Sequence, residues 1–210
     1  MSAANRAPLR SNPVRRTRRR AAVLTAGAAA AALALTACSS GGTAGGGGDT
    51  NFVAGTDGID TVAADGRAPV PDLSGKTVDG GQADIADHKG KVVVLNVWGS
   101  WCPPCRAEAK NFEKVYQDTK DQGVEFLGIN TRDASVGPAR AFEEEYGVSY
   151  PSLFDPTGKL MLRFEKGTLN PQAIPSTLVV DRDGRIAARA LQPLSEDKLR
   201  EMLAPVLAEK

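Results

Sequence analysis

An apolar run that ends at two closely spaced cysteines constrains this chain more than any other feature. From residue 92 to residue 105 the sequence reads VVVLNVWGSWCPPC, and a helical pattern follows. The β-branched start predicts a strand that is buried on both faces. Cys102 and Cys105 then stand at a strand-to-helix junction, where the helix N-terminus stabilises a thiolate and two sulfurs can bond. The segment therefore predicts a cysteine pair that cycles between dithiol and disulfide.

The first 37 residues are typical of an export signal rather than of a folded domain. Seven arginines precede the uncharged, mostly apolar residues 21–37. A basic start, an apolar centre and a small-residue end are features of a secretory signal. The alternative, a permanent membrane anchor, requires a longer apolar span. The pair Arg18-Arg19 partly resembles a twin-arginine signal, so the export route stays open.

The end of this signal, Leu35-Thr36-Ala37-Cys38, resembles the lipobox of bacterial lipoproteins. That resemblance implies cleavage before Cys38, lipidation of the cysteine and anchoring on the extracytoplasmic face of a bacterial cell membrane. The alternative is a chance thiol inside a signal. Glycine and serine dominate the next residues, which predicts a flexible tether over residues 38–67.

Composition favours a single acidic domain over residues 68–210. Removing the signal takes away seven arginines and leaves 19 basic against 25 acidic residues, a formal charge of −6. Because no basic patch remains, a nucleic-acid partner is not expected. A length of about 140 residues suits one hydrophobic core, and we expect a monomer.

Cysteine and histidine counts argue against a structural disulfide framework and against a metal site. The chain has three cysteines and one histidine, His88. With Cys38 assigned to lipid, a single cysteine pair remains, whereas a zinc site needs about four ligands. No cofactor or metal is therefore expected, and His88 is interpreted as a surface residue of a turn.

The order of the expected elements predicts an α/β fold. Its central sheet is mixed and parallel in its first half, helices cover both faces, and a short β-hairpin forms an N-terminal extension. After the hairpin, the expected elements are a strand over 92–97, a helix from 102 to about 120, a strand over 124–130, a helix over 137–145, an extended segment over 150–155, one or two helical turns over 160–166, strands over 177–181 and 186–191, and a helix from 195 to 208.

This order, with WCPPC at the first helix, resembles the thioredoxin fold and more closely the TlpA/ResA-type membrane-anchored thiol-disulfide oxidoreductases. The likeness covers residues 68–208, and its most specific stretches are NVWGSWCPPCRAE at 96–108 and IPST at 174–177. It implies an enzyme that exchanges thiols and disulfides with partner proteins, apocytochrome c among the candidates. It also implies a membrane electron donor that re-reduces the enzyme.

Chemistry and resemblance together assign roles to the cysteine pair. Cys102 is nearest the helix N-terminus, so we expect it to have the lower pKa and to attack, while Cys105 resolves the mixed disulfide. Pro103 and Pro104 have no amide N–H to donate to the Cys102 sulfur. The pKa of Cys102 should therefore be only modestly depressed, which favours a reductant over a strong oxidant.

Four further residues are expected around the pair. By resemblance, Pro175 is a cis-proline that faces the disulfide, and Ile174 precedes it; an ordinary trans bond is the alternative. Trp101 is expected to shield Cys102, whereas Trp98 is expected to pack in the core.

Glu108 is the candidate proton acceptor, because it lies three residues after Cys105 on the same helix face. Thioredoxins instead place a buried aspartate six residues before the first cysteine, where this chain has Asn96. An amide cannot take up a proton at neutral pH, so the proton-acceptor role passes to Glu108 or to a water molecule. A solvated glutamate without a role in the reaction is the alternative interpretation of Glu108.

Other functions remain open on the sequence alone. A disulfide oxidant or isomerase would use the same residues and would differ in reduction potential. A thioredoxin-like copper chaperone resembles this fold but uses C-x-x-x-C spacing and a later histidine, and no histidine follows residue 88. A peroxidase or a binding lipoprotein would not require a C-x-x-C pair.

Overall fold

The structure is a computed structural model that describes residues 50–55 and 57–209. The expected export signal, Cys38 and the first part of the expected tether lie outside these residues. The strands are β1 (Ile59–Thr61), β2 (Ser74–Lys76), β3 (Gln82–Asp84), β4 (Val92–Trp98), β5 (Val124–Thr131), β6 (Ser152–Asp155), β7 (Ser176–Val180) and β8 (Ile186–Ala190). The α-helices are α1 (Pro103–Thr119), α2 (Val136–Tyr146) and α3 (Glu196–Ala208). Single 3-10 turns are η1 (Ala64–Gly66), η2 (Ile85–His88), η3 (Lys120–Gln122) and η4 (Met161–Arg163).

Six strands form the central sheet, in the order β1-β8-β7-β4-β5-β6. Strand β4 pairs in parallel with β5, and β5 pairs in parallel with β6, whereas β7, β8 and β1 are antiparallel to their neighbours. The mixed sheet that the sequence predicts is confirmed. All seven residues of β4 are buried, as their continuous apolar pattern predicts.

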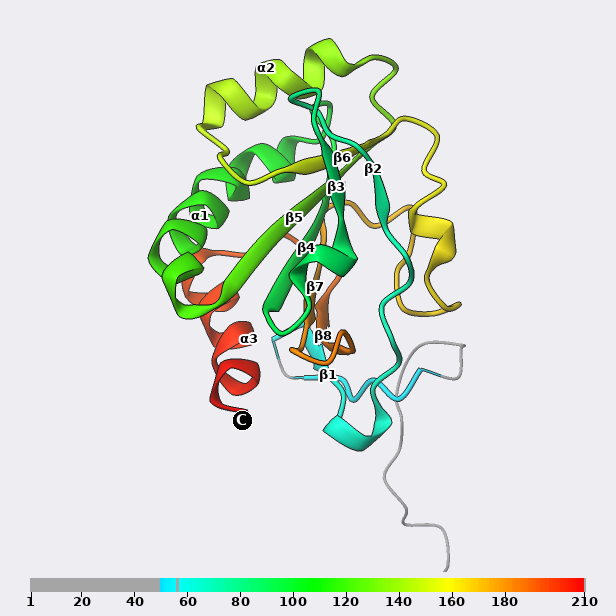
Figure 1. Cartoon of the computed structure of the whole chain (residues 1–210), viewed down its shortest axis with the longest axis vertical. Helices are drawn as coiled ribbons and strands as arrows, with labels where there is room; N and C mark the ends of the chain where they lie inside the picture. Colours follow the sequence, from blue (N-terminus) through cyan, green and yellow to red (C-terminus); the bar gives the residue numbers. More distant parts are fainter. Residues whose placement is uncertain (1–49, 56, 210) are drawn as a thin grey trace, which may run out of the picture. The chain divides into compact units, whose positions relative to one another are not determined.

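Alternation along β4 divides the core between the two faces of the sheet. Val92 and Val94 pack with buried residues of α1 and α3, while Val93, Leu95 and Val97 belong to the opposite cluster. Helix α1 contacts both α2 and α3, so the three α-helices share one face (Figure 1). On the other face, residues of η2 and η4 join the core. The helices expected on that second face are therefore single 3-10 turns.

The short hairpin expected before the core strand is confirmed. Strands β2 and β3 pair in an antiparallel ladder, and the loop between them reaches the edge of β6. The backbone N–H of Val78 donates to the carbonyl of Ser152 there, at 2.9 Å. The hairpin thereby extends across the edge of the central sheet.

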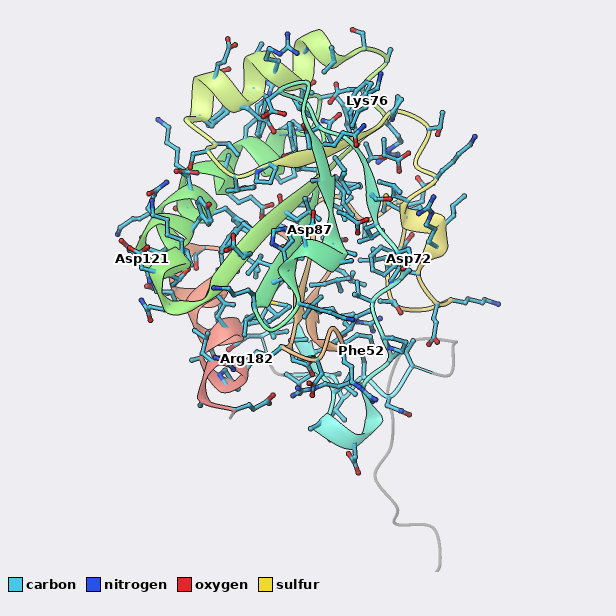
Figure 2. The ribbon with its side chains drawn as sticks, viewed as in Figure 1. Phe52, Asp72, Lys76, Asp87, Asp121 and Arg182 are labelled. Atoms are coloured by element: carbon cyan, nitrogen blue, oxygen red, sulfur yellow. A yellow bond between two sulfur atoms is a disulfide. The ribbon has the colours of Figure 1, made fainter. Side chains whose placement is uncertain are left out.

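The prediction of a flexible tether that extends to residue 67 is wrong for the last part of that segment. Strand β1 pairs with β8 and extends the sheet by one strand. Phe52, labelled in Figure 2, is buried beneath the guanidinium of Arg189, which lies 4.1 Å from its ring centroid. Arg67 is buried and forms an ion pair with Asp181 at 2.8 Å. These contacts are made between segments far apart in the sequence, and the small polar residues around them carry no periodic signal.

Within the described residues, no helix combines the length and the apolar character that crossing a membrane requires.

Candidate active site

Cys102 and Cys105 form a disulfide at the start of α1, with an S–S distance of 2.06 Å. Cys102 is the N-cap residue of the helix, and the backbone N–H of Cys105 donates to its sulfur at 3.3 Å. Pro103 and Pro104 occupy the first two helical positions, where a missing N–H is tolerated. Both cysteines are buried, each about 1% exposed. The local sequence therefore places the pair at the positive end of the helix dipole.

The Ile174–Pro175 peptide bond is cis, as expected from the resemblance. It immediately precedes β7, the antiparallel neighbour of β4. The carbonyl oxygen of Ile174 lies 3.7 Å from the sulfur of Cys102. Since a disulfide sulfur carries no proton, this is a contact and not a hydrogen bond. Residues 72 positions apart thus meet at the disulfide.

The two tryptophans have different environments. Trp98 is 3% exposed and stacks on Phe142 of α2, with ring centroids 4.4 Å apart, which confirms its packing role. Trp101 is 43% exposed, and its indole N–H donates to the carbonyl of Thr131 at 3.2 Å. The indole beside Cys102 is therefore held by the end of β5 and open to solvent.

Asp133 holds the loop that leads into Cys102. One of its carboxylate oxygens accepts from the backbone N–H of Ser100 at 2.9 Å, and the other accepts from the hydroxyl of the same residue at 2.5 Å. The side chain of Asn130 donates a third hydrogen bond at 2.7 Å. Arg106 donates twice to the carbonyl of Ser100, at 3.0 Å and 2.7 Å. The loop before the disulfide is therefore fixed from two directions.

Glu108 is buried, 2% exposed, and is not the solvated glutamate of the alternative interpretation. One carboxylate oxygen accepts from the side-chain amide of Asn96 at 3.0 Å, and the other accepts from the backbone N–H of Leu194 at 2.9 Å. Asn96 is itself buried in β4, at the position expected from the sequence. The two residues singled out by the comparison with thioredoxins thus bond directly to each other.

Burial raises the pKa of Glu108 to about 7. The hydrogen bonds from Leu194 and Asn96 lower the pKa, but the cost of placing a charge in the interior is larger. A carboxyl with this pKa can gain or lose a proton near neutral pH.

Residues 67–189 match the profile of the AhpC/TSA family. The chain belongs to this family. The thiol-disulfide oxidoreductase ResA of Bacillus anthracis is 28% identical over 137 residues, which are 65% of this chain and 73% of that protein. The thiol:disulfide interchange protein HelX of Rhodobacter capsulatus is 38% identical over 127 residues, 60% of this chain and 65% of HelX.

Solved structures of thiol-disulfide proteins have the same fold. A secreted thiol-disulfide isomerase of Corynebacterium glutamicum has a TM-score of 0.68 and 30% identity, covering 78% of this chain and all of that one. A DsbF homologue of Corynebacterium diphtheriae has a TM-score of 0.66 and 32% identity, covering 73% and 96%. This member of the AhpC/TSA family is accordingly a thiol-disulfide oxidoreductase, and Cys102 and Cys105 are its C-x-x-C pair.

Sequence reasoning did not identify Asp133 or Leu194 as parts of the site. Strands β4 and β5 are parallel, so both end at the edge of the sheet where α1 begins. Asp133 comes two residues after the end of β5, and the expected strand order could therefore have placed it near the cysteine pair. The hydrogen bond from Leu194 to Glu108 joins residues 86 positions apart. Its donor is a backbone N–H, which every residue except proline has, so the residue type gives no indication of it. Within the described residues, no group of three or more histidine, cysteine or acidic side chains is arranged around a metal position.

Proposed function

We propose that this protein is a membrane-anchored, extracytoplasmic reductant of disulfides in partner proteins. The observation that carries the proposal is the environment of the Cys102 sulfur at the start of α1. Of the first three helical positions, only Cys105 supplies an N–H to that sulfur, because the other two are prolines. Fewer donors stabilise the thiolate less, and a less stabilised thiolate makes the dithiol a better reductant.

In the proposed reaction the Cys102 thiolate attacks one sulfur of a partner disulfide. A mixed disulfide forms, and the partner's other sulfur leaves as a thiolate that takes up a proton. Cys105 then loses its proton and attacks Cys102, which releases the second partner sulfur as a thiol. Two electrons pass to the partner, and the Cys102–Cys105 disulfide remains.

Four further residues have proposed roles in this reaction. The backbone at Ile174 and Pro175 borders the disulfide and can pair with an incoming polypeptide. Glu108 lies on the face of α1 that carries Cys105, and its raised pKa suits it to accept the proton of that thiol. Trp101 would shield Cys102 from one side.

The proposed location rests on the resemblance of residues 35–38 to a lipobox, with Cys38 as the lipidated residue. A Cys38→Ser variant expressed in a bacterium that processes lipoproteins should move from the membrane fraction to the soluble fraction. The unchanged protein should incorporate a labelled fatty acid, and the variant should not. Membrane retention of the variant would contradict the lipid anchor without affecting the proposed chemistry.

The proposed partners are exported proteins with oxidised cysteine pairs, such as the haem-attachment cysteines of apocytochrome c. A membrane electron donor would restore the dithiol, and the enzyme would act as a monomer. A Cys105→Ala variant cannot resolve the mixed disulfide, so partners should stay attached to Cys102. A Cys102→Ala, Cys105→Ala double variant is the control and should trap none of them.

The direction of electron flow is tested by the reduction potential of the Cys102–Cys105 pair. Equilibration with glutathione or dithiothreitol buffers should give a midpoint in the range of thioredoxin, about −270 mV. A midpoint near about −120 mV, as in a strong oxidant, would contradict the reductant proposal. The alternative function is that of an isomerase, as the similar protein of Corynebacterium glutamicum is named. Isomerase activity on scrambled disulfides would favour this alternative.

A further inference from the structure

Arg132 has a strained backbone beside the cysteine pair. It directly follows β5 and has φ 59°, the left-handed conformation that is unfavourable for a residue with a Cβ atom. Such conformations persist where surrounding contacts hold them, and they are frequent at functional sites. The residues on either side of Arg132 supply these contacts, because Thr131 accepts from Trp101 and Asp133 accepts from Ser100.

This conformation places the Arg132 guanidinium over the ring of Trp101, 4.4 Å from the ring centroid. Arg132 is exposed, and so is Arg106, whose guanidinium is fixed by two hydrogen bonds to the Ser100 carbonyl. The two guanidinium groups thus contact the two residues that immediately precede Cys102, Arg106 at Ser100 and Arg132 at Trp101. We call Arg106 and Arg132 the arginine rim.

In the described part of the chain, the arginine rim lacks the ion pairs that balance the charge of three other arginines in the domain. Arg67, Arg189 and Arg200 each form an ion pair with a carboxylate. Neither rim arginine has a carboxylate oxygen within 4 Å among the residues that the structure describes. The nearby Asp133 is 4% exposed, and both of its oxygens accept hydrogen bonds from Ser100. The rim therefore presents uncompensated positive charge to solvent.

We propose that the arginine rim selects partner polypeptides that carry acidic side chains next to the cysteines exchanging with Cys102. This inference rests on the proposed function and names the chemistry of its substrate. A guanidinium binds a carboxylate with two parallel hydrogen bonds, and stacking on Trp101 leaves the outer N–H groups of Arg132 free for this. After the expected signal, this chain has six more acidic than basic residues. A partner with basic residues beside its cysteines would therefore be attracted to other parts of the surface, but not to the positively charged arginine rim at the disulfide.

The test is single-turnover exchange between the dithiol protein and disulfide-cyclised peptides that differ only in the flanking residues. Glutamate flanks give the acidic peptide, lysine flanks the basic peptide, and glutamine flanks the neutral peptide. We expect the unchanged protein to react faster with the acidic than with the basic peptide. The ratio of the two rate constants should fall about fivefold or more in Arg132→Glu at low ionic strength, and less at about 0.5 M salt. Arg106→Gln should lower the same ratio by a smaller factor.

Lys120→Glu is the matched control, because it makes the same change of charge directly after the end of α1 that lies away from Cys102. The next residue in the sequence, Asp121, is labelled in Figure 2. Its ratio should equal that of the unchanged protein. An unaltered ratio in Arg132→Glu, or an equal fall in Lys120→Glu, would overturn the arginine rim as a selecting surface. A variant that only loses activity reacts more slowly with both peptides by the same factor. The ratio of the two rate constants then stays unchanged, so a general loss of activity cannot be mistaken for a loss of selection. Failure of the unchanged protein to react with any peptide would instead overturn the proposed function, and this inference with it.

Discussion

Two buried carboxylates border the cysteine pair, and the regions around them differ in kind. Asp133, which holds the loop before Cys102, accepts three hydrogen bonds from Ser100 and Asn130. Glu108, inside α1, accepts only two, from Asn96 and Leu194, and burial raises its pKa to about 7. The difference indicates that one carboxylate fixes a loop while the other can exchange a proton.

The largest expected effect is that of Asp133→Ala on stability. The substitution leaves the backbone N–H of Ser100 and the side-chain amide of Asn130 without their acceptor, and each unsatisfied donor costs up to a few kcal/mol. We expect the free energy of unfolding of the oxidised protein to fall by about 4 kcal/mol. Denaturant titration measures it.

Ser100→Ala is the control for that prediction, because it removes only the hydroxyl hydrogen bond to Asp133. It should cost about 1 kcal/mol. If both variants lose the same small amount, Asp133 does not fix the loop and the contrast with Glu108 disappears.

Glu108→Gln should change how stability depends on pH. Because the pKa of Glu108 is about 7 in the folded protein and ordinarily 4.5, folding takes up a proton between these values. The contribution of Glu108 is therefore fully present below pH 4.5 and is lost as pH rises to about 7, by roughly 3 kcal/mol. The variant should have a flatter profile over this range. The rate at which Cys105 resolves a mixed disulfide should also fall, on the order of tenfold to a hundredfold near neutral pH.

Glu143→Gln is the matched control for Glu108→Gln. Burial also raises the pKa of Glu143 to about 7, but this residue lies on α2. Its replacement should flatten the stability profile in the same direction and leave the pH profile of disulfide resolution unchanged. Equal changes of that pH profile in both variants would mean that Glu108 has no specific role in proton transfer.

The smallest expected effect is a further shift in the pKa of Glu108 in Asn96→Ala. The amide of Asn96 donates to the carboxylate and so favours its charged form. Without this donor the pKa should rise by about one unit, which carbon-13 NMR titration of the carboxyl would detect. A lower pKa would show that water enters and solvates Glu108 instead.

Elements with a local pattern could be predicted from the sequence, whereas contacts between distant segments could not. The apolar run of β4 and the start of the last helix at Ser195 each depend on a few neighbouring residues, and both were expected. Strand β1 was missed because three residues of mixed polarity acquire strand geometry only by pairing with β8.

The amino-acid sequence by itself determined the chemistry of this protein, because two cysteines and two prolines at the start of a helix define a redox pair through local geometry. Only the tertiary structure decided what surrounds that pair. Glu108 acquires its high pKa from burial despite a hydrogen bond from a backbone N–H 86 positions away, and the loop before Cys102 is held by a residue 33 positions from Ser100. Such contacts depend on how the sheet and helices pack, and packing has no signature in a short stretch of sequence.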